Sequence, residues 1–206
     1  DAPEAVVQPG PVTAWLAGAG IDAKRYSGST TWLRHRWFIL ISKQSVPTIL
    51  DAGALHLAGR FNQPTLITPH AGELARLLTA RGVTVTSEAI EGNPKKWAVI
   101  ASEKLNVVVL LKGAHTVVAD GDSIIELPVS TPWLATAGSG DVLAGIVGAL
   151  IATNYIEILN DSKRLSEVAA SAAFIHNSAA LLASRDTPIS ATQIIEYIPD
   201  VIRKLI

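Results

Sequence analysis

The sequence predicts an α/β protein with a mainly parallel central sheet, helices on both faces of the sheet and one small β-hairpin. Short apolar segments typical of strands alternate with longer segments of helical character, which is the pattern of a layered α/β fold. Residues 107–111 are five consecutive apolar residues, as in a parallel strand buried on both faces. The chain has 206 residues, 49% of them hydrophobic, which suits one large domain better than two small ones.

The predicted strands are short, and each ends at residues that turn the chain. They cover residues 12–16, 46–50, 64–67 and 107–111, followed by a hairpin of residues 116–119 and 124–127 around Asp120-Gly121-Asp122. Helices are predicted over residues 30–42, 73–78, 94–105, the apolar segment that follows Gly140, and 165–184. Ser190 is expected to cap a helix of residues 191–197, and residues 199–206 close the chain.

Composition and charge exclude several classes of function. The formal net charge is −1 and there is no run of basic residues, so we expect no nucleic-acid partner. No apolar run is long enough to span a bilayer, so we also expect no membrane partner. Without cysteine, the chain has no disulfides, no thiolate zinc site and no cysteine nucleophile. The first residue is Asp1 and methionine is absent, which favours a fragment of a longer protein.

The segment 135–150 contains the strongest candidate for chemistry. Gly138 and Gly140 allow backbone geometries in which N–H groups converge on one point, and the helix that follows adds its own unpaired N–H groups. Such a turn binds an anion, most simply a phosphate. Asp141 would repel that anion, so its presence points to a general base that accepts a hydroxyl proton. The alternative is a tight turn in which Asp141 only stabilises the start of the helix.

Further polar residues follow the predicted strands, where open α/β sheets bind ligands. His70 and Glu73 lie three residues apart and would share the first turn of a helix, either as site residues or as a helix cap. Lys112 leaves a buried strand next to a glycine, which suits a phosphate contact, although such lysines often only reach solvent. Asp51 follows another strand and could meet a ribose or a metal, or cap the next turn.

Three segments in order carry a resemblance to a known family. Residues 68–74 read Thr-Pro-His-Ala-Gly-Glu-Leu, residues 111–116 Leu-Lys-Gly-Ala-His-Thr, and residues 135–145 Ala-Thr-Ala-Gly-Ser-Gly-Asp-Val-Leu-Ala-Gly. Together they resemble the bacterial ADP/ATP-dependent NAD(P)H-hydrate dehydratases, which belong to the ribokinase-like superfamily. Residues 51–55 match as well, except that Gly53 stands where the family often has Asp. The resemblance implies that residues 1–206 form a single ribokinase-like domain that lacks its N-terminal glycine-rich portion.

The resemblance implies a lyase that repairs NAD(P)H hydrated at C6 of the nicotinamide ring, in the S epimer. ADP, or alternatively ATP, would phosphorylate the C6 hydroxyl with the help of Mg²⁺, and elimination of phosphate would regenerate NAD(P)H. A cytoplasmic homo-oligomer, such as a tetramer, is expected. The implied roles are Asp141 as the catalytic residue; Gly20, His70 and Asp141 around the hydrated nicotinamide; Lys112, Gly113, Ala114, His115, Thr116, Gly138, Ser139 and Gly140 for the nucleotide; and Glu73 for the metal, indirectly.

Two other functions stay open at this point. A ribokinase-like kinase for a small molecule, such as a vitamin precursor, would share the Gly-Ser-Gly-Asp turn. His70 favours the dehydratase, because such kinases typically have Asn at this position. An inactive nucleotide-binding or scaffolding protein is the other alternative, and the intact Asp141 and Lys112 argue against it.

Overall fold

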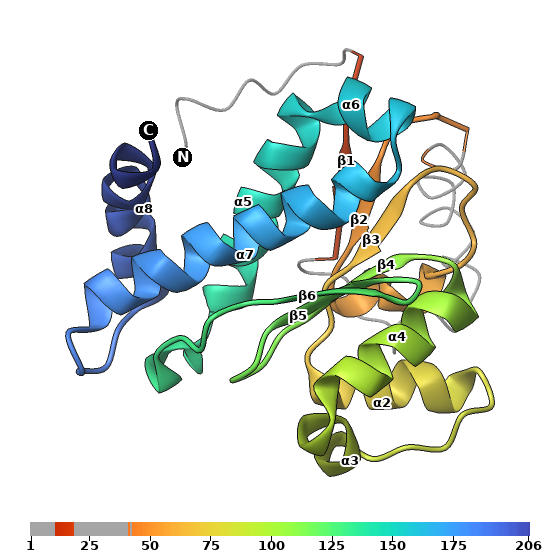
Figure 1. Ribbon diagram of the computed structural model, residues 1–206, viewed down its shortest axis with the longest axis horizontal. Helices are drawn as coiled ribbons and strands as arrows, with labels where there is room; N and C mark the ends of the chain where they lie inside the picture. Colours follow the sequence, from red (N-terminus) through yellow and green to blue (C-terminus); the bar gives the residue numbers. More distant parts are fainter. Residues whose placement is uncertain (1–10, 19–40, 42) are drawn as a thin grey trace, which may run out of the picture.

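The computed structural model describes residues 11–18, 41 and 43–206 (Figure 1). The described residues form a six-stranded sheet in which the spatial order of the strands is their order in the sequence. The strands are β1 (Trp15–Ala17), β2 (Thr48–Leu50), β3 (Thr65–Ile67), β4 (Val108–Leu111), β5 (Val117–Asp120) and β6 (Ser123–Glu126).

Strands β1 to β4 run parallel, and β5 and β6 continue the sheet as an antiparallel hairpin. The prediction of a mainly parallel sheet with one hairpin is therefore confirmed. Parallel neighbours place their carboxyl ends at one edge of the sheet. As a result, the residues that follow β2, β3 and β4 meet there, and these are Asp51, Thr68 and Lys112.

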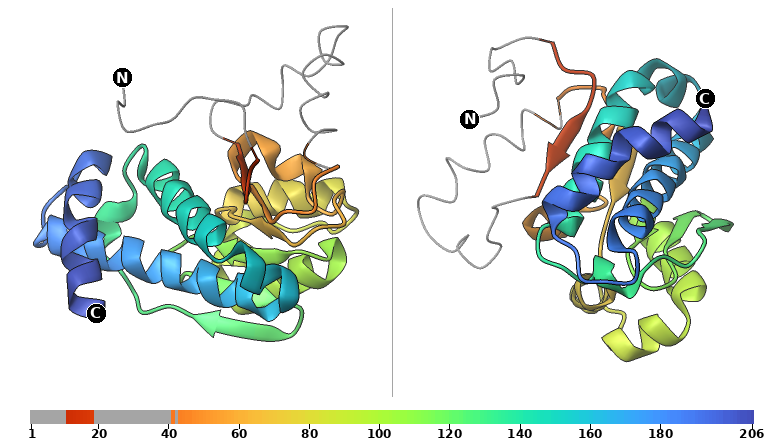
Figure 2. Two further views of the ribbon diagram at one scale, coloured as in Figure 1. Left: turned by 90° about the horizontal axis from the view of Figure 1, so that it is seen from above. Right: turned by 90° about the vertical axis from the view of Figure 1, so that its left-hand side faces the viewer.

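Helices cover both faces of the sheet, as predicted. Those of the first half of the chain are α2 (Ala71–Ala80), α3 (Ser87–Gly92) and α4 (Pro94–Leu105), with a 3₁₀ turn, η2 (Ala52–Leu57). Those of the second half are α5 (Ser139–Thr153), α6 (Tyr155–Asn160), α7 (Lys163–Ser184) and α8 (Ala191–Leu205), preceded by a 3₁₀ turn, η3 (Pro132–Leu134). Figures 1 and 2 show the two groups on opposite sides of the strands.

Strand β4 shows why the sheet is buried on both faces. Val109 and Leu111 pack with α2, α3 and α4, whereas Val108 and Leu110 pack with α5, α6 and α7. Successive side chains of a strand point to opposite faces, so a strand between two helical layers needs apolar residues at every position. The unbroken apolar run in the sequence has this cause.

Two details differ from the sequence prediction. Residues 191–197 and 199–206 form one continuous helix, α8, with Pro199 inside it. Its buried residues Ile194 and Val201 lie on either side of the proline and pack with α7, so tertiary packing outweighs the one backbone hydrogen bond that proline removes. The short helices α3 and α6 were not predicted, because six residues give too little periodicity. The predicted helix 30–42, except Ile41, and Gly20 lie outside the described residues.

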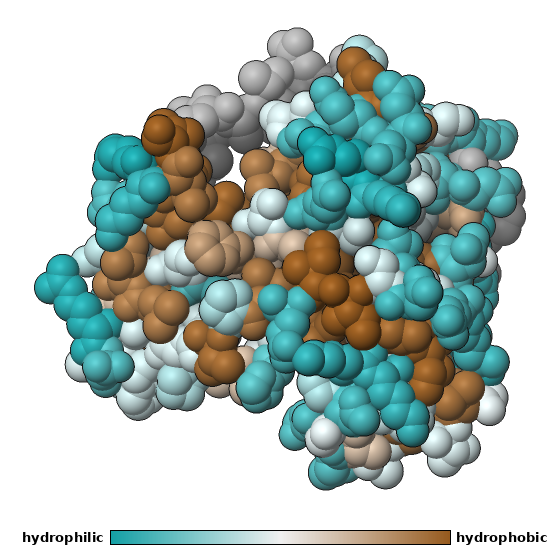
Figure 3. Space-filling model, in the orientation of Figure 1, coloured by the Kyte–Doolittle hydropathy of each residue, from teal (hydrophilic) through white to brown (hydrophobic). Residues whose placement is uncertain are grey.

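The surface of α8 carries exposed apolar side chains. Ile195, Ile202 and Leu205 are all exposed on it, and apolar groups lie over this helix at the left of Figure 3. In the described part of the chain, no helix has the length and hydropathy needed to cross a bilayer. The expected homo-oligomer stays a prediction.

Leu110 of β4 is fully buried against the helical layer that contains α7, so its truncation tests the assignment of the core. Leu110→Ala should lower the free energy of unfolding by about 2–5 kcal/mol, because a cavity is added to the lost burial. Ile124→Ala on β6, where the side chain is 40% exposed, is the matched control and should cost about 0.5 kcal/mol. Urea unfolding measures both, and equal losses would contradict the assignment of Leu110 to the core.

Candidate active site

The carboxyl edge of the sheet holds an ion pair between residues that are far apart in the sequence. Lys112 Nζ lies 2.9 Å from Asp51 Oδ1, and the hydroxyl of Thr68 donates to the same oxygen at 2.8 Å. Asp51 is buried, with 4% of its surface exposed, and it makes no side-chain cap to the following turn. A buried carboxylate needs such partners, and Lys112 is thereby held at the sheet edge rather than extended into solvent.

His70 and Glu73 form the cap of helix α2. The N–H of Gly72 donates to His70 Nδ1 at 3.1 Å, and the N–H of His70 donates to Glu73 Oε2 at 2.9 Å. Of the two interpretations considered from the sequence, the structure therefore shows the helix cap. The two side chains nevertheless lie at the edge of the sheet, next to Lys112. Glu73 Oε2 is 3.9 Å from Lys112 Nζ, and His70 pairs with Lys112 in a parallel bridge.

The first turn of α5 is held by its surroundings. Gly138 has a φ of 85°, and a Cβ built on it would lie 3.1 Å from the Cβ of Ala191. A side chain there would meet both backbone strain and α8, so the position requires glycine. The N–H of Ser139 donates to Thr136 O, and that of Val142 to Gly138 O. Gly140 and Asp141 keep N–H groups without a partner inside the helix, as a helix start provides.

Lys112 lies next to this helix start. A Cβ built on Gly140 would be 3.6 Å from Lys112 Nζ, so an ammonium group stands beside the N–H groups of the turn. Both segments line one cavity of about 710 Å³. Its lining includes His70, Lys112, Gly113, Ala114, Thr116, Ser139 and Gly140 from the predicted set, and residues 129–132, 134–136, Leu143, His176 and Asn177 besides.

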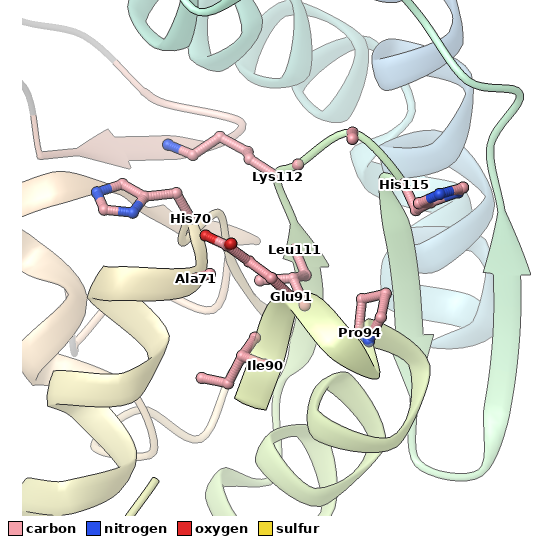
Figure 4. Close-up of a pocket in the computed structure, with 10 residues that line it drawn as sticks. His70, Ala71, Ile90, Glu91, Pro94, Leu111, Lys112 and His115 are labelled. Carbon is pink, nitrogen blue, oxygen red and sulfur yellow. The ribbon is translucent and has the colours of Figure 1, made fainter. Parts of the chain in front are cut away.

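A second cavity of about 410 Å³ is lined by the loop after β4 and by residues of α2 and α3 (Figure 4). It shares His70, Lys112, Gly113 and Ala114 with the first cavity and adds His115 and Glu91. In Figure 4, His70 and Lys112 point to the same side, whereas His115 lies apart from them. The loop that carries Lys112 therefore contributes to the lining of both cavities.

Three predicted site residues lie near the cavities without lining either of them in the described part of the chain: Glu73, Gly138 and Asp141. Asp141 is the third residue of α5 and is exposed. Among the described residues, its carboxylate has no hydrogen-bond or ion-pair partner. Nothing there prevents Asp141 from accepting a proton from a molecule bound at the helix start.

His176 is a buried residue of α7. Its Nε2 lies 3.0 Å from the carbonyl oxygen of Ser139, and only 4% of its surface is exposed. Burial lowers the pKa of His176 below its ordinary value of 6.5, and the charge of Lys112 adds to this, while the Asn177 side chain and the Ser139 carbonyl oppose it. The ring is therefore neutral at pH 7.

Asp51 and His176 join the site through tertiary contacts. Asp51 contacts a lysine 61 residues later, and His176 contacts a carbonyl 37 residues earlier. Their positions at a strand end and inside a long helix were the only sequence signals available. The described residues contain no cluster of three or more His, Asp or Glu side chains that would hold a metal by themselves.

The comparisons with known proteins agree with this geometry. The family model described as NAD(P)H-hydrate dehydratase matches residues 9–200. This chain belongs to that family. The matched range includes the four residues that the structure brings to this site: Asp51, His70, Lys112 and Asp141.

Individual relatives show the extent of the similarity. The bifunctional NAD(P)H-hydrate repair enzyme of Corynebacterium glutamicum is 33% identical over 96% of this chain, which spans 38% of that protein. The ADP-dependent (S)-NAD(P)H-hydrate dehydratase of Neisseria meningitidis is 31% identical over 87% of the chain and is matched over 58% of its own length.

The solved structures identify the fold. The ADP/ATP-dependent NAD(P)H-hydrate dehydratase of Bacillus subtilis, co-crystallised with ATP/Mg²⁺, superposes with a TM-score of 0.74 at 24% identity, over 93% of this chain and 64% of that one. The fold is ribokinase-like.

The lowered pKa of His176 predicts how stability depends on pH. At a pH between the folded-state pKa of His176 and 6.5, the imidazole is protonated in the unfolded chain and neutral in the folded chain. The free energy of unfolding is therefore highest above pH 6.5 and decreases as the pH falls below it. The melting temperature should drop from about pH 7.5 to about pH 5.5, and by less in His176→Gln, which cannot titrate. Parallel curves for the two proteins would contradict the buried neutral histidine.

Proposed function

We propose that this protein repairs hydrated NAD(P)H by a nucleotide-dependent dehydration of the S epimer. ADP or ATP phosphorylates the hydroxyl at C6 of the hydrated nicotinamide ring, and phosphate then leaves. The observation that carries this proposal is the meeting of Lys112 with the start of α5, which puts an ammonium group and unpaired N–H groups at one cavity beside Asp141. Family membership supports the choice of substrate.

The nucleotide occupies the larger cavity, with its phosphates toward Lys112 and Gly140. Phosphoryl transfer depends mainly on positioning and on neutralising charge, and these groups do both. The apolar and small residues of the 129–136 segment, with Leu143, form the wall against which the base packs. His70 lines both cavities. It contacts the hydrated nicotinamide, which lies on the side of the phosphates opposite the adenine.

Asp141 acts as the general base. It takes the proton of the C6 hydroxyl as the oxygen attacks the terminal phosphorus, and the bond from that phosphorus to the nucleotide breaks. The lone pair of the ring nitrogen then expels phosphate from C6, and the released phosphate takes a proton from C5, which restores the dihydronicotinamide. No further acid is required, because phosphate is a good leaving group.

The charges at the sheet edge suit Mg²⁺. Asp51 and Glu73 carry two negative charges around the single positive charge of Lys112, so an arriving phosphate needs a further cation. Proteins commonly hold Mg²⁺ through one or two carboxylates plus the phosphates of the substrate, which matches these residues. Glu73, whose Oε2 is 3.9 Å from Lys112 Nζ, would act on the ion indirectly, and the ion would neutralise phosphate charge when bound.

The direct test incubates the protein with hydrated NADH and either ADP or ATP in the presence of Mg²⁺. We expect dihydronicotinamide absorbance to return only when a nucleotide is present, with one phosphate released per NADH formed. Comparing the two nucleotides identifies the donor. Phosphorylation of a vitamin precursor without any recovery of NADH would instead make the protein a kinase.

Asp141→Asn separates catalysis from structure. The variant keeps the shape of the residue but cannot take the proton, so turnover should fall by about 10²–10⁴-fold. Nucleotide affinity should stay the same or rise, because a negative charge near the phosphates is removed. The melting temperature serves as control, since the lost dipole interaction costs about 1 kcal/mol or less. Near-normal turnover with a lowered melting temperature would leave Asp141 with a structural role alone.

A further inference from the structure

The strongest unassigned feature is the buried histidine behind the phosphate-binding turn. Ser139 O is a carbonyl oxygen and can only accept, so the proton of the neutral His176 ring must be on Nε2. Nδ1 is then an acceptor, and among the described residues it has no hydrogen-bond partner. A buried acceptor without a partner is unfavourable, so an apolar side chain would suit the packing of α7 better.

We propose that His176 is a positioning residue for the nucleotide site, and that its Nε2–H, donated to Ser139 O, fixes the first turn of α5 so that the N–H groups of Gly140 and Asp141 face the phosphate. This inference rests on the proposed function. His176 touches neither phosphate nor hydroxyl in it, and acts through the backbone of the turn.

The contacts of Ser139 support this role, because all three of its polar groups are hydrogen-bonded and they reach two different segments. Its hydroxyl donates to Leu134 O at 2.8 Å, its N–H donates to Thr136 O at 3.3 Å, and its carbonyl accepts from His176. The first two partners belong to the loop before α5, which lines the cavity itself. The third partner, His176, ties the turn to the long helix α7 by a hydrogen bond.

The rigidity of the turn affects nucleotide binding because Ser139 lies between two glycines, Gly138 and Gly140. Glycine has the largest conformational freedom, so a turn with two glycines has much entropy to lose when it closes on a phosphate. A hydrogen bond to the residue between them removes part of that freedom before the nucleotide binds. Preorganisation of this kind improves affinity without a new contact to the ligand.

The test compares two amide side chains of different length. In His176→Gln the amide can reach the position of Nε2 and donate to Ser139 O, whereas in His176→Asn it reaches only the position of Nδ1. We expect the dissociation constants of ADP and ATP, measured by calorimetry without the hydrate, to rise about 2- to 10-fold in His176→Asn, the range of one hydrogen bond. His176→Gln should stay within about twofold of wild type. The KM for the nucleotide should follow, and the KM for the hydrate should not.

Ile175→Val is the matched control, since Ile175 is the buried neighbour on α7 that belongs to the apolar cluster between α7 and α8 and has no polar group to donate to Ser139 O. It should lower the melting temperature and leave nucleotide affinity unchanged. Equal affinities of His176→Asn and His176→Gln, or a matching loss of affinity in Ile175→Val, would overturn the positioning role while the proposed function stands. Wild-type protein that binds neither ADP nor ATP would overturn the proposed function and this inference with it.

Discussion

The ion pair between Lys112 and Asp51 is the contact around which the site is arranged. It joins the ends of β2 and β4 across β3, and Thr68 at the end of β3 donates to the same carboxylate oxygen. The carboxyl ends of β2, β3 and β4 are thereby tied together. Removing one partner of such a buried pair leaves an uncompensated charge, which costs about 3–5 kcal/mol. The pair therefore couples the geometry of the site to the stability of the sheet.

The other half of the site belongs to the helices of the second half of the chain. The start of α5 lies between α8 and α7. Gly138 is packed against Ala191 of α8, and Ser139 is hydrogen-bonded to His176 of α7. Lys112 meets this turn at Gly140. The site thus lies where the two packing layers of the sheet come together at its carboxyl edge.

Most of the fold could be predicted because strong local patterns agreed with it. The apolar run 107–111 and the turn Asp120-Gly121-Asp122 correspond to β4 and to the β5–β6 hairpin. The cap of α2 was considered from the spacing of His70 and Glu73. Pro199 was misleading, since residues of α8 on both sides of it are buried against α7. Local propensity is a weak guide where tertiary packing decides.

The candidate site was predictable only where a motif was continuous in the sequence. The segments 112–116 and 138–141 could be proposed from glycine, lysine and aspartate alone. The role of Asp51 could not, because one strand end carrying a carboxylate does not tell which later residue will pair with it. The same holds for His176, whose partner is a backbone carbonyl and has no side-chain signature at all. Long-range contacts of this kind follow from the topology.

The start of α5 sets a conflict that the geometry resolves. The positive end of a helix dipole stabilises a nearby anion, so it would stabilise both the Asp141 carboxylate and a bound phosphate. These two negative charges would also repel one another. Asp141 is exposed and water screens its charge, whereas Gly140 faces the ammonium group of Lys112 at the cavity wall. In the proposed reaction, the phosphate would take the side of the helix start that faces Lys112, and the carboxylate would remain on the side open to the hydroxyl group. Two consecutive residues of one helical turn can in this way serve the anion and the proton separately.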